Sequence, residues 1–219
     1  MKFVKTTTMS FKRIVISLSI FLLVPVLRLV LTPFTHSETL SLMLALNLSA
    51  WILLIYDWEL FGLHWNRAKS ALADSILYAV IGFVFLFFWT LFNAAYLNGK
   101  MLLPDEAILH SYPIAKPPVL FAYSISLSVI INISFKCITD RFKVHAREAA
   151  MILMSGFVFG LIYTITMTPV RLPFLLQTYL YNMITITALS YMYNQTHSFV
   201  PGLTALAAVL LIWQLVFVV

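Results

Sequence analysis

The stretch from Ser128 to Tyr163 reads SVIINISFKCITDRFKVHAREAAMILMSGFVFGLIY. Two apolar runs flank a short basic segment, and neither run alternates polar with apolar residues. In hydrocarbon only helices and closed barrels satisfy their own backbone polar groups, and a barrel strand would show that alternation. The stretch therefore predicts two membrane helices, Val119–Phe135 and Ala149–Thr168, joined by a basic loop.

The composition extends this prediction to the whole chain. Of the 219 residues, 62% are apolar and 10% are charged, with a mean hydropathy of +0.95. A soluble domain averages about 45–50% apolar and about 25% charged residues. The excess predicts an all-α, polytopic membrane protein. We interpret the net charge of +6 as Lys and Arg facing anionic lipid, and we expect no nucleic-acid partner.

The apolar runs predict about seven transmembrane helices in one domain covering residues 1–219. Two of them occupy residues 1–56, and five form a second half over residues 74–219. Residues 57–73 mix aromatic and charged side chains, as in a segment lying along lipid headgroups. The expected spans are Phe11–Leu31, Leu40–Tyr56, Asp74–Tyr96, Val119–Phe135, Ala149–Thr168, Phe174–Tyr193 and Val200–Val219. The first run lacks a small-residue cleavage site, so we expect a retained helix and no signal peptide.

Lysines and arginines predict the orientation. With the N-terminus inside, ten lie on the inner side and three in outer loops, while Arg28 lies near the outer end of the first span. This bias predicts a cytoplasmic N-terminus and an external C-terminus. The inner set is Lys2, Lys5, Lys12, Arg13, Arg67, Lys69, Lys136, Arg141, Lys143 and Arg147, and the outer set is Lys100, Lys116 and Arg171.

Three short segments follow one another in an order known from one membrane-protein family. They are INISFK at Ile131–Lys136, FGLIY at Phe159–Tyr163, and YNQTHSFVP at Tyr193–Pro201, which leads to Leu206. They resemble the EExxxR, FxxxH and final His/Asn motifs of the CPBP family, the CAAX prenyl protease and bacteriocin-processing or self-immunity (Abi) proteins. The resemblance covers roughly residues 57–215. It implies a CPBP-like bundle in a bacterial cell membrane.

The chain departs from this family at the positions that carry its chemistry. Ile131 and Asn132 stand where the paired glutamates would be, and Tyr163 and Leu206 stand at the histidine positions. A general base must accept a proton near neutral pH, which a phenol with a reference pKa of about 10 does poorly. Lys136 keeps the charge of the family's arginine without its bidentate fork. The resemblance thus implies a degenerate, non-catalytic member.

Three functions follow from this comparison. The first is a pseudoenzyme that binds a membrane or envelope protein or a peptide, in a regulatory or bacteriocin-immunity role. The second is an active CPBP-type endopeptidase with atypical residues. The third is a small transporter component. The near absence of strongly charged residues deep in the expected spans argues against the third, because ion relays usually need intramembrane carboxylates or histidines.

Polar residues on the helix before the basic segment form a candidate pocket. Ser124, Ser128 and Asn132 recur every four residues and share one helix face. Together with Phe159 and Tyr163 they are our candidate pocket lining. The alternative, which we favour for the three polar residues, is interhelical hydrogen bonding and close packing.

Small residues suggest how the next helix packs. Gly156 and Gly160 form the chain's GxxxG, which predicts close approach of this helix to the preceding span within one subunit. A homo-oligomer face is the alternative. Cys137, the single cysteine, excludes an internal disulfide; we interpret it as a small packing residue, with palmitoylation as the alternative.

The remaining polar residues give weak signals. His145 with Glu148, and Glu106 with His110, have helical spacing but offer only two ligands each, so we expect no metal and no cofactor. The other histidines are expected to lie isolated at the interface, and amides in apolar runs predict either an interior hydrogen-bond network or a hydrophilic path. These histidines are His36, His64 and His197, and the amides are Asn47, Asn93, Gln177, Asn182 and Gln214.

Overall fold

The structure is a computed structural model that describes residues 9–97, 116–143, 147–167 and 174–217. Every regular element in these ranges is helical, which confirms the all-α class. In chain order the elements are α1 (Phe11–Thr35), α2 (Glu38–Tyr56), α3 (Trp58–Ser70), α4 (Leu72–Phe92), the π-helical turn η1 (Asn93–Leu97), α6 (Lys116–Lys143), α7 (Glu148–Met167), α8 (Leu175–Thr196) and α9 (Val200–Phe217).

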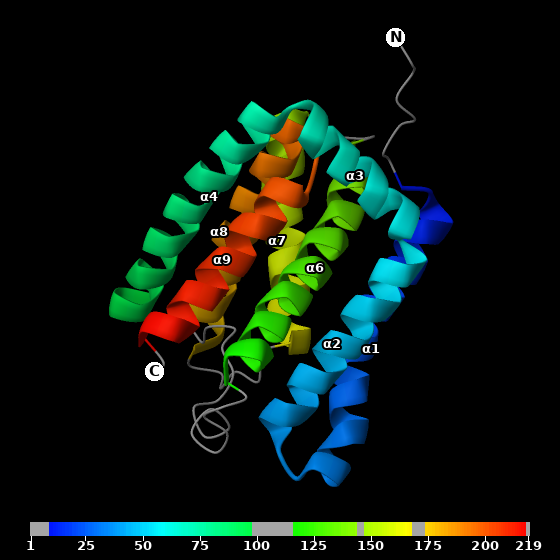
Figure 1. The fold of residues 1–219 in the computed structure, drawn as a ribbon, viewed down its shortest axis with the longest axis vertical. Helices are drawn as coiled ribbons and strands as arrows, with labels where there is room; N and C mark the ends of the chain where they lie inside the picture. Colours follow the sequence, from blue (N-terminus) through cyan, green and yellow to red (C-terminus); the bar gives the residue numbers. More distant parts are fainter. Residues whose placement is uncertain (1–8, 98–115, 144–146, 168–173, 218–219) are drawn as a thin grey trace.

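The long helices run between two ends of a bundle, and α3 lies across one of them (Figure 1). We call this the α3 end. There α1, α4, α7 and α9 begin, and α2, α6 and α8 finish. Helices α2 and α3 meet at an angle of 81°. Because α2 alone has 19 residues, about 28 Å of helix, it is nearly long enough to cross the hydrocarbon core, and α3 lies beyond it.

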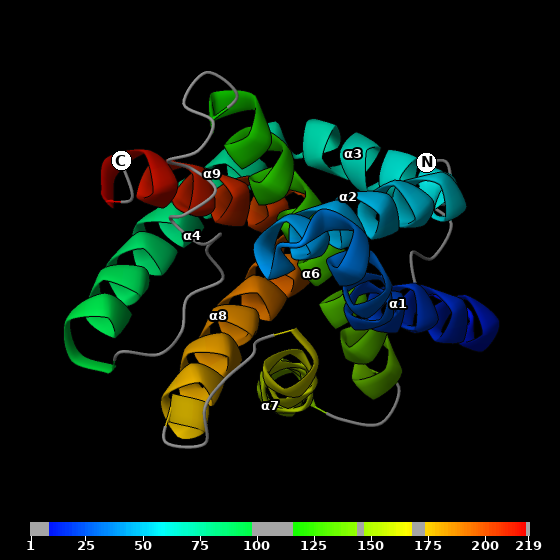
Figure 2. The same ribbon diagram turned by 90° about the horizontal axis from the view of Figure 1, so that it is seen from below.

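Helix α6 occupies the centre of the bundle, as the view from below makes clear (Figure 2). It packs against α1, α2, α7, α8 and α9. Most of the segment Phe121–Arg141 is buried inside the protein. Leu127, Ile130, Ile133 and Phe135 from several sides of this helix all belong to the core. A helix that is buried on all sides needs apolar residues on all sides, and α6 has them.

Four helical segments are long and apolar enough to cross a membrane: Phe11–Thr35, Leu72–Leu97, Phe121–Arg141 and Glu148–Thr166. A fifth is added when the bent pair α2–α3 counts as one span, and Val200–Trp213 is a shorter apolar helix. The length and apolar composition of these segments indicate a membrane location. The described residues thus support four or five of the seven expected spans, and seven spans stay a prediction.

The outer faces of the bundle are apolar. Both α1 and α4 leave most of their length exposed, and large side chains such as Leu29, Ile55 and Phe88 are largely uncovered. Continuous apolar surface of this extent is rare on soluble monomers. It suits contact with acyl chains, where no hydrophobic penalty arises.

Caps fix several helix boundaries. Ser10 and Ser37 are the N-caps of α1 and α2, and each side chain accepts a hydrogen bond from a backbone N–H of the first turn. His36 and His197 follow the last turns of α1 and α8 in the left-handed region, with φ of 52° and 50°. Two of the three histidines expected to lie isolated at an interface are therefore helix C-caps.

The predicted basic loop is mostly helix, so that expectation is wrong. Helix α6 continues beyond Phe135 to Lys143, and only residues 144–146 separate it from the described part that leads into α7. Lys136 and Asp140 are one turn apart on α6 and pair with each other. Opposite charges at this spacing support a helix, so the charges do not end it.

The GxxxG packs against a different helix from the one expected. A Cβ added to Gly160 would lie 2.8 Å from the Met183 Cα, and one added to Gly156 would lie 1.9 Å from the Thr187 Oγ1. Both neighbours belong to α8. The two glycines therefore permit close packing of α7 on α8, whereas the expectation placed them against the preceding span, α6.

Candidate functional site

Two carboxylates are buried at the α3 end, where α1, the α2–α3 junction, α6 and α8 meet. Asp57 is 0% exposed and Asp140 is 4% exposed. A buried carboxylate is costly unless it is paired and hydrogen-bonded. We call these two residues and the groups that bind them the charge cluster. Its members are Met9, Arg13, Ser17, Asp57, Lys136, Asp140 and Tyr193.

Asp140 is held from three directions. Its Oδ2 pairs with Lys136 Nζ and accepts a hydrogen bond from the Met9 backbone N–H at 3.1 Å. Its Oδ1 accepts a hydrogen bond from the Tyr193 hydroxyl at 3.0 Å. Lys136 Nζ also lies 5.4 Å from the centroid of the Tyr193 ring, within cation–π range. This carboxylate thus joins α6, α8 and the residues that precede α1.

Asp57 makes the corresponding connection at the bend between α2 and α3. Its Oδ1 accepts a hydrogen bond from Arg13 Nε at 2.5 Å, and its Oδ2 accepts one from Ser17 Oγ at 2.9 Å. Arg13 Nη2 also donates to the Tyr56 carbonyl at 3.4 Å. Both donors to the carboxylate come from α1, so the charge of Asp57 fixes the bend against that helix.

The cluster is electrically balanced. Asp57 and Asp140 supply two negative charges, and Arg13 and Lys136 supply two positive charges. Such pairs contribute little net stability by themselves, but removing one partner leaves an unpaired buried charge and costs about 3–5 kcal/mol. The arrangement is suited to holding four chain segments in one geometry.

His64 is buried, not isolated at an interface as predicted. Its ring centroid lies 4.4 Å from that of Phe199 and 5.9 Å from that of Tyr193. Burial, reinforced by the positive charges of Lys136 and Arg67, lowers the pKa of His64 to about 3. The imidazole is therefore neutral at physiological pH and packs α3 against the start of α9.

The residues matched to the family motifs contact different helices. Lys136 lies in the charge cluster beside α8. Asn132 donates to the Ser128 carbonyl at 2.8 Å, and its Oδ1 would lie 2.9 Å from a Cβ on Gly202 of α9. Tyr163 packs against the Phe21 ring of α1.

The remaining predicted residues are core residues. Ile131, Phe159 and Leu206 are all buried. The ring of Phe159 lies 5.3 Å from that of Phe21, so α7 meets α1 at this point. Ser124 is buried on α6 as well. No arrangement of a carboxylate with an imidazole is seen among these contacts in the described part of the chain.

Buried polar atoms remain on α6, and one of them, on Asn132, lies beside Gly202 of α9. Ser128 Oγ and Asn132 Oδ1 are buried without a hydrogen-bonding partner among the described residues. A buried polar atom normally has a partner in the protein or in ordered water. The face expected to line a pocket thus retains free hydrogen-bonding capacity, and a water molecule is the smallest ligand that would use it.

Amides elsewhere in the spans make interhelical hydrogen bonds. Asn47 accepts a hydrogen bond from Ser126 Oγ at 2.8 Å, joining α2 to α6. Asn182 donates to Thr164 Oγ1 at 2.9 Å, joining α8 to α7. Cys137 is also interior: its thiol is buried and lies 3.5 Å from the Met9 Sδ.

Of the four residues in the two candidate metal pairs, the structure describes only Glu148. Glu106, His110 and His145 lie outside the described residues, as does the side chain of Gln214. Glu148 is described, and its carboxylate accepts a hydrogen bond from Asn194 on α8. Within the described ranges no three side chains of the His, Cys, Asp or Glu type gather as metal ligands would.

Sequence reasoning missed most of the charge cluster. It placed Asp57 at the start of a headgroup segment and Asp140 in a loop. The spacing of Lys136 and Asp140 was an available signal, because residues four apart face each other on a helix. No local pattern indicates that Asp57 accepts hydrogen bonds from α1, since its partners precede it by about 40 residues.

No family model, no curated protein and no solved structure matches this chain. The similarity to CPBP proteins therefore rests on the three short motif segments, and membership of that family stays a prediction.

Proposed function

We propose that this chain is a non-catalytic membrane protein of the CPBP type that binds a membrane or envelope protein or a peptide. It would sit in the bacterial cell membrane with its N-terminus inside and its C-terminus outside. The α3 end is then the cytoplasmic end. The proposed role is regulatory or of the bacteriocin-immunity kind.

The observation that carries the proposal is the set of contacts that the Lys136 side chain makes. In the resemblance this position belongs to a catalytic motif. Here its ammonium pairs with Asp140, which also binds Tyr193 and the Met9 backbone. The side chain is 0% exposed and committed to holding helices together. These contacts support a structural role for Lys136 and not a catalytic one.

The other matched positions support the same proposal. Asn132 carries an amide that bonds to its own helix, and Leu206 is an alkyl group in the core. Tyr163 is enclosed by Phe21 and Phe159. None of these side chains is a base suited to activating water near neutral pH.

The surface offered to a partner is the basic rim of the α3 end. Lys12, Lys69, Arg141 and Arg147 are exposed there, and Arg67 is half-buried. Glu59, Asp74 and Glu148 are the exposed carboxylates described at this end. Because Asp57 and Asp140 are engaged inside, cations exceed carboxylates on the outside. A partner with an acidic cytoplasmic segment would complement this rim.

Photo-crosslinking in living cells tests the proposal. A photoreactive amino acid replaces Arg147 on the rim or, as the matched control, Leu153 on the exposed apolar face of α7, the helix that begins immediately after Arg147. We expect one defined protein or peptide adduct from position 147 and none from position 153. Arg141→Glu should lower the yield of that adduct several-fold, and Arg141→Lys should preserve it.

Two results would contradict the proposal. One is equal, undefined labelling from both positions, which would mean that the rim has no specific partner. The other is cleavage of a peptide by the purified chain in nanodiscs, lost in Asn132→Ala or Tyr163→Phe. Such cleavage would favour the endopeptidase alternative.

A further inference from the structure

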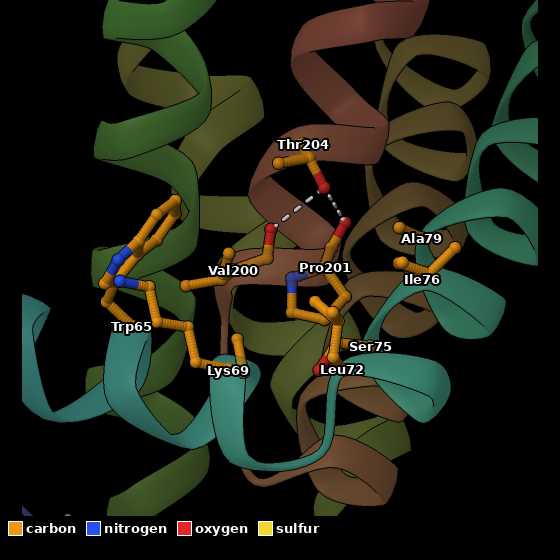
Figure 3. Close-up of a pocket in the computed structure, with 10 residues that line it drawn as sticks. Trp65, Lys69, Leu72, Ser75, Ile76, Ala79, Val200, Pro201 and Thr204 are labelled. Carbon is orange, nitrogen blue, oxygen red and sulfur yellow. Dashed lines mark hydrogen bonds between the residues drawn. The ribbon is translucent and has the colours of Figure 1, made fainter.

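A groove runs between α4 and α9, starting at the α3 end (Figure 3). It consists of two adjoining cavities of about 280 Å³ and 260 Å³. The two share Ile76, Ala79 and Thr204, so they form one continuous space along the helices. The first cavity also reaches Trp65 and Lys69 of α3, and the second extends to Phe83 on α4 and to Ala208 on α9.

Small side chains create the groove. Ala79 on α4 faces Ala205 and Ala208 on α9, and these leave space that larger residues would fill. Thr204 belongs to the wall, but its hydroxyl donates to the Val200 and Pro201 carbonyls of its own helix (Figure 3). The wall between α4 and α9 is therefore largely apolar. Its shape and chemistry match an acyl chain and not a polar solute.

The end of the groove near α3 has the opposite character. Lys69 Nζ lies 5.6 Å from the centroid of the Trp65 ring, so a cation–π contact holds the ammonium at the mouth. Tryptophan is the side chain favoured at the level of lipid headgroups. No carboxylate belongs to the described lining of either cavity.

Ser75 supplies a second, independent signal. This residue lines the first cavity and is only 8% exposed, so it adds a polar residue to an otherwise largely apolar wall. Ser75 and Lys69 line the same cavity, so a hydroxyl and an ammonium are both available there to an oxygen-rich anion.

We propose that this groove binds one anionic glycerophospholipid. An acyl chain lies between α4 and α9, and the phosphate lies near the Lys69 ammonium with the glycerol esters toward the Ser75 hydroxyl. Charge complementarity at the mouth selects the anionic headgroup, and the apolar length selects a lipid over free phosphate. The proposal is independent of the binding partner proposed above.

Native mass spectrometry of the full chain in mild detergent tests this site. The probes are phosphatidylglycerol and phosphatidylcholine with identical acyl chains. We expect one phosphatidylglycerol per chain, bound in clear preference to phosphatidylcholine. Lys69→Gln should weaken phosphatidylglycerol binding about fivefold, the change that corresponds to ~1 kcal/mol for one cation near anionic lipid. Lys12→Gln removes a cation at the same end but away from the groove and should change nothing.

A second pair of variants tests the apolar part. Ala79→Leu fills the groove and should abolish binding of both lipids. Ala73→Leu adds the same bulk to an exposed position of α4 outside the lining and should preserve binding. Circular dichroism and gel filtration establish that each variant is folded; if Ala79→Leu is not, the two lysine variants decide. Equal binding of the two lipids, or equal losses in Lys69→Gln and Lys12→Gln, would overturn the proposal.

Discussion

Lys136 and Asp140 form an ion pair one turn apart on α6, and both side chains are buried at the α3 end of the bundle. The pair is part of a larger cluster in which Asp140 also binds Tyr193 and the Met9 backbone. A charged pair at this depth constrains which helices can lie next to one another. The first prediction concerns the free energy of unfolding that is lost when one partner of this pair is removed.

Either Lys136→Met or Asp140→Asn should destabilise the protein, because Lys136→Met leaves the Asp140 carboxylate unpaired and Asp140→Asn leaves the Lys136 ammonium without its counter-ion. We expect a loss of about 3–5 kcal/mol for Lys136→Met in the free energy of unfolding, measured by denaturant titration in mixed micelles. The double variant should lose less than the sum of the single variants. Additive losses would show that the two side chains do not interact.

His64 should make stability depend on pH. Its pKa is lowered to about 3 in the folded protein, while an unfolded chain has the ordinary value near 6.5. Between those values the unfolded state binds more protons, so stability should fall as the pH drops below about 6.5, by up to ~1.4 kcal/mol per pH unit. Unfolding curves for the wild type and His64→Phe should diverge between pH 7.5 and 5. Parallel curves would mean that His64 is not the cause.

The two glycines of α7 should be intolerant of added bulk. In Gly160→Ala the new methyl would lie 2.8 Å from the Met183 Cα, which is backbone and cannot move aside easily. We expect a cost of about 1–3 kcal/mol, measured as thermal stability in detergent. Gly62→Ala is the matched control: nothing lies within 4 Å of its added Cβ, and alanine favours helix by up to ~1 kcal/mol. A dimer that dissociates in Gly160→Ala without loss of stability would instead assign this face to an oligomer.

Gly202 and Asn132 should show coupled effects. A Cβ on Gly202 would lie 2.9 Å from the Asn132 Oδ1 and 3.2 Å from the Leu189 Cδ2. Gly202→Ala should therefore cost about 1–2 kcal/mol, and part of that loss should return when Asn132→Ala makes room. Unfolding titrations of the two single variants and the double variant measure the coupling. Zero coupling would mean that α6 and α9 do not meet at these positions.

The sequence predicted what depends on local composition. Apolar runs predicted the helical class, the membrane and most helix positions, including the close approach that Gly156 and Gly160 permit. The predictions were wrong for charged residues whose partners lie far away in the sequence. Lys136 was read as part of a basic loop because its neutralisation by Asp140 inside a bundle depends on packing from α1 and α8. The GxxxG predicted close packing but could not specify α8 as the neighbour.

The candidate site was harder to predict than the fold, for the same reason. Asp57 looks like an interfacial carboxylate in its own segment, and only Arg13 and Ser17 on α1 make it an interior one. His64 likewise resembles a surface residue until Phe199 covers it. The resemblance to a known family drew attention to Asn132 and Tyr163, but that resemblance concerns positions on a helix and not the partners that these residues have here.

The central place of α6 has a consequence for how the protein is made. This segment has the lowest mean hydropathy of the four that could span a membrane, and it carries Lys136 and Asp140. A translocon passes such a helix into lipid poorly until its neighbours cover the charges. A nascent chain ending after α6 should therefore expose Cys137 to a water-soluble maleimide, whereas the complete bundle encloses this single thiol and protects it.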